Sequence, residues 1–129
     1  MPKFSKSSKE HLNRLHPDLQ KILVEVIKVF DFKIICSYRD RESQMTAYRE
    51  GTSKLQWPNS KHNKLPAMAA DIIPYPISWK NTSRFLMLMG AVKMTAYNLG
   101  IKIRLGGDWN SNNDPSDDSF SDLCHVELV

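Results

Sequence analysis

The chain is poor in cysteine and contains no long apolar segment. It has two cysteines, Cys36 and Cys124, in 129 residues. Two cysteines do not make a disulfide framework, and we expect both to be buried, reduced thiols because cysteine is often buried. No apolar run approaches the roughly 18 residues that suggest a membrane span, and the first residues lack the apolar stretch of a signal peptide. We therefore expect synthesis in the cytoplasm and no insertion into membranes.

A second domain and a linker are also missing from the sequence. The length of 129 residues is near the commonest domain size and allows a useful core to be buried without disulfides. No internal repeat is present. The sequence therefore predicts a single domain over residues 1–129, and we expect it to be a monomer.

Basic residues are in excess, but they are not arranged as a nucleic-acid track. The formal net charge is +4, and such a surface attracts polyanions in general. Lys3, Lys6 and Lys9 come closest to a basic arm, and arginines are not interleaved with aromatic residues. We interpret the charge as a solvated face that keeps the protein soluble, and we expect no nucleic-acid partner.

The helix signals are local and specific. Ser7 opens a sequence that fits a capping box, which predicts a first helix that is broken or restarted at Pro17. Apolar residues at helical spacing continue after that proline and recur in a longer segment that Gly100 closes. Asp40 is expected to cap a short helix that ends at Gly51.

Strand formers gather in four short segments. These segments are residues 33–38, 69–74, 101–105 and 124–129. In the last one, alternation places His125 and Glu127 on one face and Cys124 on the other. The order of elements predicts an α+β fold in which helices pack on one face of a small antiparallel sheet.

Four residues, His62, Asp71, Asp122 and His125, carry the chemistry. Two imidazoles and one carboxylate are the usual protein ligands of a hydrolytic zinc ion, which keeps its fourth position for water. The remaining carboxylate would act as the base. His62 and Asp71 are nine positions apart across Pro66, so we expect them at the two ends of a loop that folds back. We expect all the metal residues at strand ends, and we interpret the set as the site of a metallohydrolase.

The same residues lie in motifs that resemble a known family. The motifs read SKHN at 60–63, AADI at 69–72, GGDWN at 106–110 and DLCHVEL at 122–128, with SYR at 37–39 upstream, followed by Gln44 and Gly51. Together they resemble the phage L-alanyl-D-glutamate endopeptidases, which are endolysins of the D-alanyl-D-alanine metallopeptidase superfamily. The stretch from His62 to Asp71 is two residues longer than the commoner form of the motif, and Pro66 stands near where a glycine is usual.

The resemblance implies a role for each residue. His62, Asp71 and His125 would hold Zn²⁺, which lowers the pKa of a bound water towards about 7. Asp122, three positions before the last ligand, would be the base. From its chemistry and not from the resemblance, Arg39 is our candidate for the cation that stabilises the oxyanion, because an arginine presents a permanent charge and a rigid set of donors. Contacts with the substrate or the cleft are expected from Ser60, Gln44, Trp109 and Glu127.

Alternative roles remain open for two of these residues. A carboxylate inside an apolar strand, such as Asp71, needs a compensating cation. Arg39 would be a structural salt-bridge partner if it met that need. Asp122 would be a turn residue if it only capped the turn before the last strand.

The implied activity is that of a zinc peptidase acting on bacterial peptidoglycan. It would cleave the stem peptide between L-alanine and D-glutamate during host lysis, without a separate wall-binding domain. Such a lysin waits in the host cytoplasm until the membrane is opened. A D-alanyl-D-alanine carboxypeptidase is the close alternative. A non-catalytic wall-binding domain is the more distant one, and it would need a fourth protein ligand to close the zinc site.

The segment after Trp109 contains oxygen ligands of the kind that calcium prefers. The spacing lacks the glycine and the glutamate of an EF-hand loop, and we interpret the segment as a polar, solvated loop. If Ca²⁺ did order it, the ion would act on the nearby Asp122. The ligand candidates are Asn112, Asn113, Asp114, Asp117 and Asp118.

Overall fold

The strands form one antiparallel sheet. The computed structural model describes residues 2–114 and 122–129. Within these residues four strands pair in the spatial order β1, β2, β4, β3, and every pairing is antiparallel. The strands are Phe32–Cys36 (β1), Ala69–Pro74 (β2), Ile103–Leu105 (β3) and His125–Leu128 (β4). The expected small antiparallel sheet is confirmed, and β2 and β4 are its inner strands.

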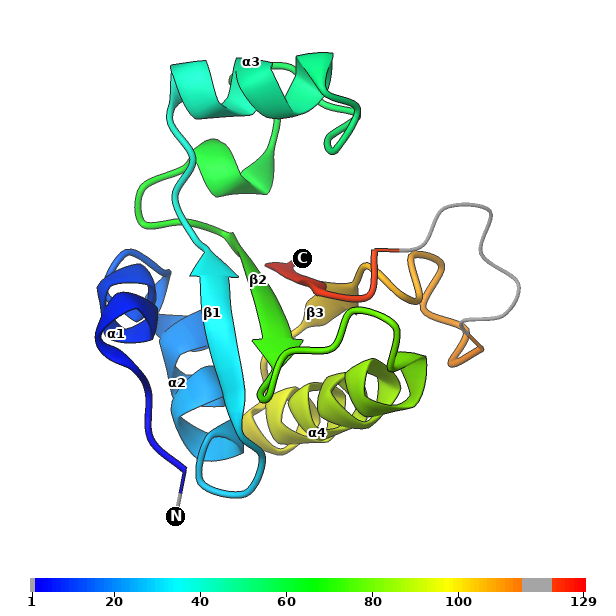
Figure 1. The fold of residues 1–129 in the computed structure, drawn as a ribbon. Helices are drawn as coiled ribbons and strands as arrows, with labels where there is room; N and C mark the ends of the chain where they lie inside the picture. The colour runs from blue at the N-terminus through cyan, green and yellow to red at the C-terminus, as the bar shows by residue number, and fades with distance from the viewer. Residues whose placement is uncertain (1, 115–121) are drawn as a thin grey trace.

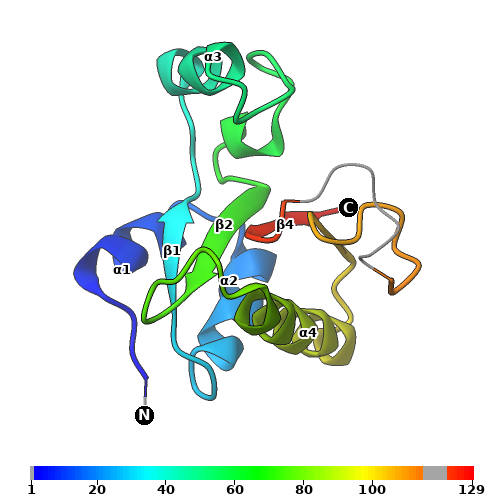
Figure 2. The ribbon, with the colours of Figure 1, turned by 45° about the vertical axis from the view of Figure 1, so that its right-hand side comes forward.

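Most of the helical residues pack against one face of this sheet. α2 and α4 pack together below the sheet and α1 lies against β1, whereas α3 stands apart, beyond the end of β1 (Figure 1). The turned view in Figure 2 shows the same separation of α3. In the described part of the chain no helix has both the length and the apolar character that crossing a membrane requires. The helices are Lys6–Leu12 (α1), Pro17–Val26 (α2), Arg41–Arg49 (α3), the 3-10 helix Lys61–Asn63 (η1) and Thr82–Leu99 (α4).

Alternation along the inner strands separates a core face from an open face. Ala70 of β2 and Val126 of β4 are fully buried in one cluster with apolar side chains of α2 and α4. Complete burial of a large aliphatic side chain contributes roughly 1.5–3 kcal/mol relative to exposure, so this cluster fixes the sheet on the helices. Asp71, His125 and Glu127 alternate with the core residues and therefore point to the opposite, open face.

The helix ends show which local signals were interpreted correctly. Asp40 caps α3 and Gly100 ends α4 with a φ of 72°, as predicted. The capping box predicted at Ser7 is wrong: Ser5 is the cap, and its Oγ accepts a hydrogen bond from the backbone N–H of Ser8 at 3.2 Å. Ser7 already lies inside the first turn of α1, which begins at Lys6.

Candidate metal centre and active site

Asp71 lies at the centre of the site. In the sheet register it is opposite Cys36 of β1 on one side and His125 of β4 on the other. Its Oδ1 is 3.2 Å from Nδ1 of His125 and 3.4 Å from Nε2 of His62, and its Oδ2 is 3.7 Å from the Arg39 guanidinium. Burial alone would raise the pKa of Asp71, but hydrogen bonds from the two imidazoles outweigh it and lower the pKa. Arg39, His62 and His125 together therefore stabilise the negative charge of the buried Asp71 carboxylate.

His62 is carried by a 3-10 helix and not by a strand end, which corrects the sequence-based expectation. The hydroxyl of Ser60 caps η1 by accepting a hydrogen bond from the backbone N–H of His62 at 3.2 Å. Nδ1 of His62 lies 2.8 Å from the carbonyl oxygen of Ser37, so its N–H donates there and Nε2 faces Asp71. Burial lowers the pKa of His62, but hydrogen bonds with Asp71 and Cys36 outweigh it and raise the pKa to about 10.

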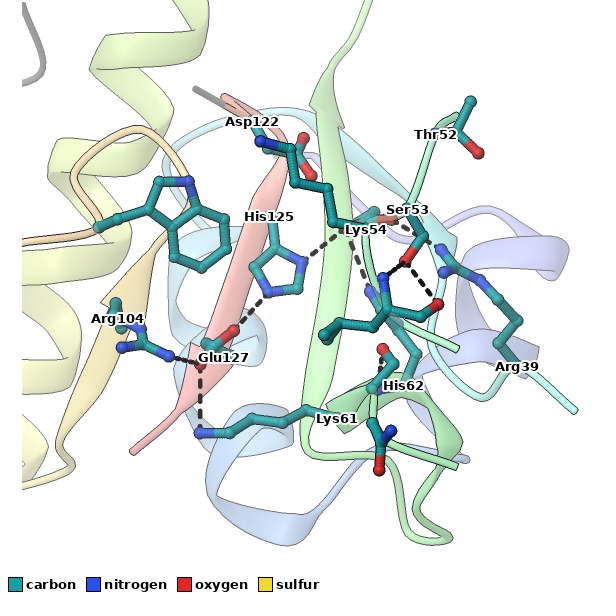
Figure 3. A pocket seen from close by; sticks show the side chains of 15 residues that line it. Arg39, Thr52, Ser53, Lys54, Lys61, His62, Arg104, Asp122, His125 and Glu127 are labelled. Atoms are coloured by element: carbon teal, nitrogen blue, oxygen red, sulfur yellow. Dashed lines mark hydrogen bonds and ion pairs between the residues drawn. The ribbon is translucent and has the colours of Figure 1, made fainter. Parts of the chain in front are cut away.

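His125 is oriented from its other side by Glu127. Nε2 of His125 is 2.8 Å from a carboxylate oxygen of Glu127 (Figure 3). Its Nδ1 faces Asp71 at 3.2 Å. Glu127 is in turn held by Arg104 at 2.8 Å and by Lys61 at 3.2 Å. Burial would raise the pKa of Glu127, but the hydrogen bonds from His125, Arg104 and Lys61 lower it to about 2. The carboxylate of Glu127 therefore stays charged and accepts a hydrogen bond from the Nε2–H group of His125.

The residue types, two imidazoles and one carboxylate, are those of a hydrolytic zinc site, and two of the three ligand separations fit a tetrahedral ion. The described groups whose ligand atoms all lie within 4.8 Å of one another do not contain both imidazoles, so His62 and His125 would have to approach each other when the ion binds. Zn–N and Zn–O bonds of about 2.0–2.2 Å place neighbouring ligand atoms about 3.3–3.5 Å apart. The Asp71 Oδ1 contacts with His62 and His125, at 3.4 and 3.2 Å, are close to that separation. Both imidazoles also have an oxygen acceptor on the outer nitrogen, which is the arrangement that fixes the ring and the tautomer of metal-bound histidines.

Both cysteines lie beside this centre, which sequence reasoning did not anticipate. Ligand atoms of Cys36, His62 and Asp71 lie within 4.8 Å of one another, and so do those of Asp71, Asp122 and Cys124. The thiols are free but only partly buried, so the expectation that both are buried is wrong. Cys124 precedes β4 in a turn, and strand alternation therefore does not direct its side chain.

Asp122 is placed by a close backbone approach. Its N–H donates to the carbonyl of Gly106 at 2.8 Å, and its carbonyl accepts from the N–H of His125 at 3.1 Å. A Cβ at Gly106 would lie 2.2 Å from the Asp122 carbonyl oxygen, so only glycine allows this contact. The Cys124 thiol donates to Oδ1 of Asp122 at 3.0 Å. The backbone of Asp122 serves the turn, and its side chain lines the pocket of the candidate site.

The candidate site opens into a pocket of about 300 Å³. Arg39 and the four residues that sequence reasoning selected, His62, Asp71, Asp122 and His125, all line it. Ser60, Trp109 and Glu127 line it too, as expected of cleft residues. The ring of Trp109 lies 5.3 Å from that of His125, measured between centroids.

Comparison with known proteins gives the family. The family model for phage L-alanyl-D-glutamate peptidases matches residues 1–129. The chain belongs to this family. It is 33% identical to the L-alanyl-D-glutamate peptidase of Escherichia phage T5, over 98% of each chain. Its fold is similar to that of the Serratia marcescens L-Ala D-Glu endopeptidase ChiX, with a TM-score of 0.76, 24% identity and coverage of 99% of this chain and 91% of that one. The resemblance found in the motifs is thereby confirmed.

Gln44 does not occupy the place expected from the family motif. It is completely buried, and it is not among the residues that line the pocket. Its Oε1 accepts a hydrogen bond from Arg39 at 3.0 Å. Contrary to the expectation, Gln44 is therefore not placed to contact a substrate directly. It contacts Arg39, which does line the pocket.

Sequence reasoning also missed polar residues on the pocket wall. Lys61 and Arg104 hold Glu127, and Ser53 and Lys54 line the pocket from the segment after α3. Of these four residues, only Lys61 could have been selected from the sequence, because it directly precedes His62 in the SKHN motif. Arg104 comes opposite Glu127 only through the strand register, which the sequence alone does not give.

The calcium hypothesis cannot be followed through the whole segment. Asp117 and Asp118 lie outside the described residues. In the described part, the N–H of Asp114 donates to the side chain of Asn112 at 2.9 Å, which is the local turn pattern of a polar loop. Calcium binding by this segment therefore stays an untested hypothesis beside the interpretation as a polar loop.

If His125 binds zinc, replacing Glu127 by alanine should weaken zinc binding about ten- to hundredfold, as loss of an outer hydrogen-bond partner of a metal-bound histidine usually does. Competition with a chromophoric zinc chelator measures the affinity. Glu25→Ala is the matched control, because Glu25 forms only an exposed pair with Lys28. Unchanged affinity in Glu127→Ala would contradict a role of Glu127 in orienting His125 for the metal.

Proposed function

We propose that the protein is a zinc-dependent peptidoglycan endopeptidase that hydrolyses the stem peptide between L-alanine and D-glutamate. Membership of the L-alanyl-D-glutamate peptidase family supports the substrate and the bond. The observation that carries the proposal is one pocket that holds two imidazoles and a carboxylate together with a second carboxylate and an arginine. We place the enzyme in host lysis, acting as a monomeric phage or prophage endolysin once the membrane has been opened.

His62, Asp71 and His125 would hold the zinc ion. A zinc ion bound there supplies an activated water and polarises the scissile carbonyl. The surrounding groups prepare the ligands: Ser37 and Glu127 accept the outer N–H groups of the two imidazoles. This fixes which nitrogen of each ring is available for coordination.

Asp122 is the proposed base and Arg39 the proposed oxyanion partner. Asp122 would take the proton of the attacking water and return it to the departing amine. The thiol of Cys124 holds one of its carboxylate oxygens. The guanidinium of Arg39 lies 3.7 Å from Asp71 and lines the pocket. One permanent charge could therefore compensate Asp71 and also stabilise the oxyanion of a substrate bound in the pocket.

A second candidate function is a zinc-containing wall-binding domain without activity. It requires a fourth protein ligand that closes the metal site. The observation in its favour is Cys36, whose thiol lies with His62 and Asp71 in a group of ligand atoms within 4.8 Å. In this alternative the zinc ion would serve folding alone.

The products of digestion test the proposed function. Purified peptidoglycan is digested with the zinc-loaded protein, and the new termini are identified by mass spectrometry. We expect new amino-terminal D-glutamate and carboxy-terminal L-alanine, and none of either after metal removal with a chelator. Release of free D-alanine instead would indicate the carboxypeptidase, and no new termini would indicate the wall-binding domain.

A further inference from the structure

The amide of Gln44 joins two walls of the pocket. Its Oε1 accepts hydrogen bonds from Arg39 Nη1 at 3.0 Å and from Asn63 Nδ2 at 3.1 Å. Its Nε2 donates to Ser53 Oγ at 2.9 Å and to the carbonyl oxygen of Leu55 at 2.6 Å. A side-chain amide has two acceptor and two donor positions, so the hydrogen-bonding capacity of Gln44 is filled.

The chemistry of the partners determines the orientation of this amide. The Arg39 guanidinium can only donate, so it requires Oε1, and the Leu55 carbonyl can only accept, so it requires Nε2. Gln44 has no exposed surface, and a buried polar network of this kind is costly when one member is left unpaired. Neither methionine nor glutamate, which have nearly the same size, can satisfy all four partners.

The partners of Gln44 belong to different parts of the site. Ser53 and Leu55 line the pocket from the segment after α3, the part of the chain that stands apart from the sheet (Figure 1). Arg39 lines the pocket, and its guanidinium lies 3.7 Å from Oδ2 of Asp71. The wall formed by Ser53 and Leu55 and the Arg39 guanidinium are thus connected through the side chain of Gln44.

We propose that Gln44 is a positioning residue that sets the Arg39 guanidinium and the wall formed by Ser53 and Leu55 as one unit. The inference rests on the proposed function, because it assigns the wall to the substrate chain and Arg39 to the scissile carbonyl. Gln44 itself would touch neither the substrate chain nor the scissile carbonyl. Its loss should therefore impair binding through the wall and turnover through Arg39 at the same time.

Gln44→Met tests this proposal through kcat and KM measured separately. We expect kcat to fall about ten- to hundredfold, the range for loss of a hydrogen bond to a charged group, and KM to rise as well. In the Arg39→Ala background, Gln44→Met should raise KM but leave kcat unchanged, because its effect on kcat passes through Arg39. The matched control is Gln20→Met, since the side chain of Gln20 donates to the Leu15 carbonyl at 2.9 Å and Gln20 is not among the residues that line the pocket.

Two further variants keep the proposal testable if Gln44→Met does not fold. Ser53→Ala removes one wall contact and should raise KM alone. Gln44→Glu keeps an acceptor for Arg39 but has no donor for Ser53 or Leu55, so it should raise KM more than it lowers kcat.

A readout without substrate separates this proposal from the proposed function. Guanidinium N–H resonances of Arg39 should be protected from exchange in the parent protein and in Gln20→Met, and lose that protection in Gln44→Met. Parent protein that shows this protection but hydrolyses no peptidoglycan would overturn the proposed function only. Parental kcat and KM in Gln44→Met, or additive kcat effects of Gln44→Met and Arg39→Ala, would overturn the positioning role.

Discussion

Replacing Asp122 by asparagine should lower kcat for peptidoglycan hydrolysis by a factor of about 10² to 10⁴, the usual contribution of a general acid–base group. Asparagine keeps the shape of the side chain but cannot take a proton from water at neutral pH. Zinc should remain bound, since Asp122 is not one of the three proposed ligands. The measurements are the rate of release of new amino termini and the zinc content after dialysis.

Asp40→Asn is the matched control for this change. Asp40 is fully exposed at the start of α3, and asparagine caps a helix as well as aspartate does. Parental activity in Asp122→Asn would leave Asp122 as a turn residue without a catalytic role. Loss of zinc together with activity would make Asp122 a metal ligand, in line with its proximity to Asp71 and Cys124.

The parts of the fold that could be predicted are those with local signals. An apolar run between polar neighbours gives β2 at residues 69–74, the bounds that the structure has. Gly100 in the left-handed region and the cap at Asp40 depend only on adjacent residues. Ser7 shows the limit of such reasoning, because several serines near one helix start satisfy the same local pattern. The strand order β1, β2, β4, β3 could not be read from the sequence, since pairing depends on long-range packing.

The candidate site could be predicted where residue type alone restricts the chemistry. Histidine and aspartate in the family motifs pointed to His62, Asp71 and His125, and the structure brings their side chains together. Cys36 carries no such signal: a β-bulge between residues 34 and 36 accompanies its pairing with Asp71. The role of Gln44 was equally hidden, because a motif shows that a residue belongs to the site but not whether it faces the pocket or the interior.

Replacing His125 by alanine should abolish stoichiometric zinc binding, whereas Cys36→Ser should leave it intact. Loss of a protein ligand is expected to cost more than the ten- to hundredfold that loss of an outer partner costs. Zinc bound only to the folded protein stabilises it by about 2.7 kcal/mol at a hundredfold excess over Kd. The zinc-dependent rise in Tm should therefore be present in the parent protein and in Cys36→Ser, and absent in His125→Ala.

This pair of variants decides between two candidate coordination sets, one with His62, Asp71 and His125 and one that includes Cys36. His125 reaches Asp71 at 3.2 Å and is oriented by Glu127, whereas Cys36 lies near the outer nitrogen of His62, at 3.6 Å from Nδ1. That nitrogen already donates to a backbone carbonyl, so coordination through it would break a buried hydrogen bond. Retained zinc in His125→Ala together with lost zinc in Cys36→Ser would overturn the ligand set of His62, Asp71 and His125. The metal would then be held by sulfur, and the closed, non-catalytic alternative would become the better account of the site.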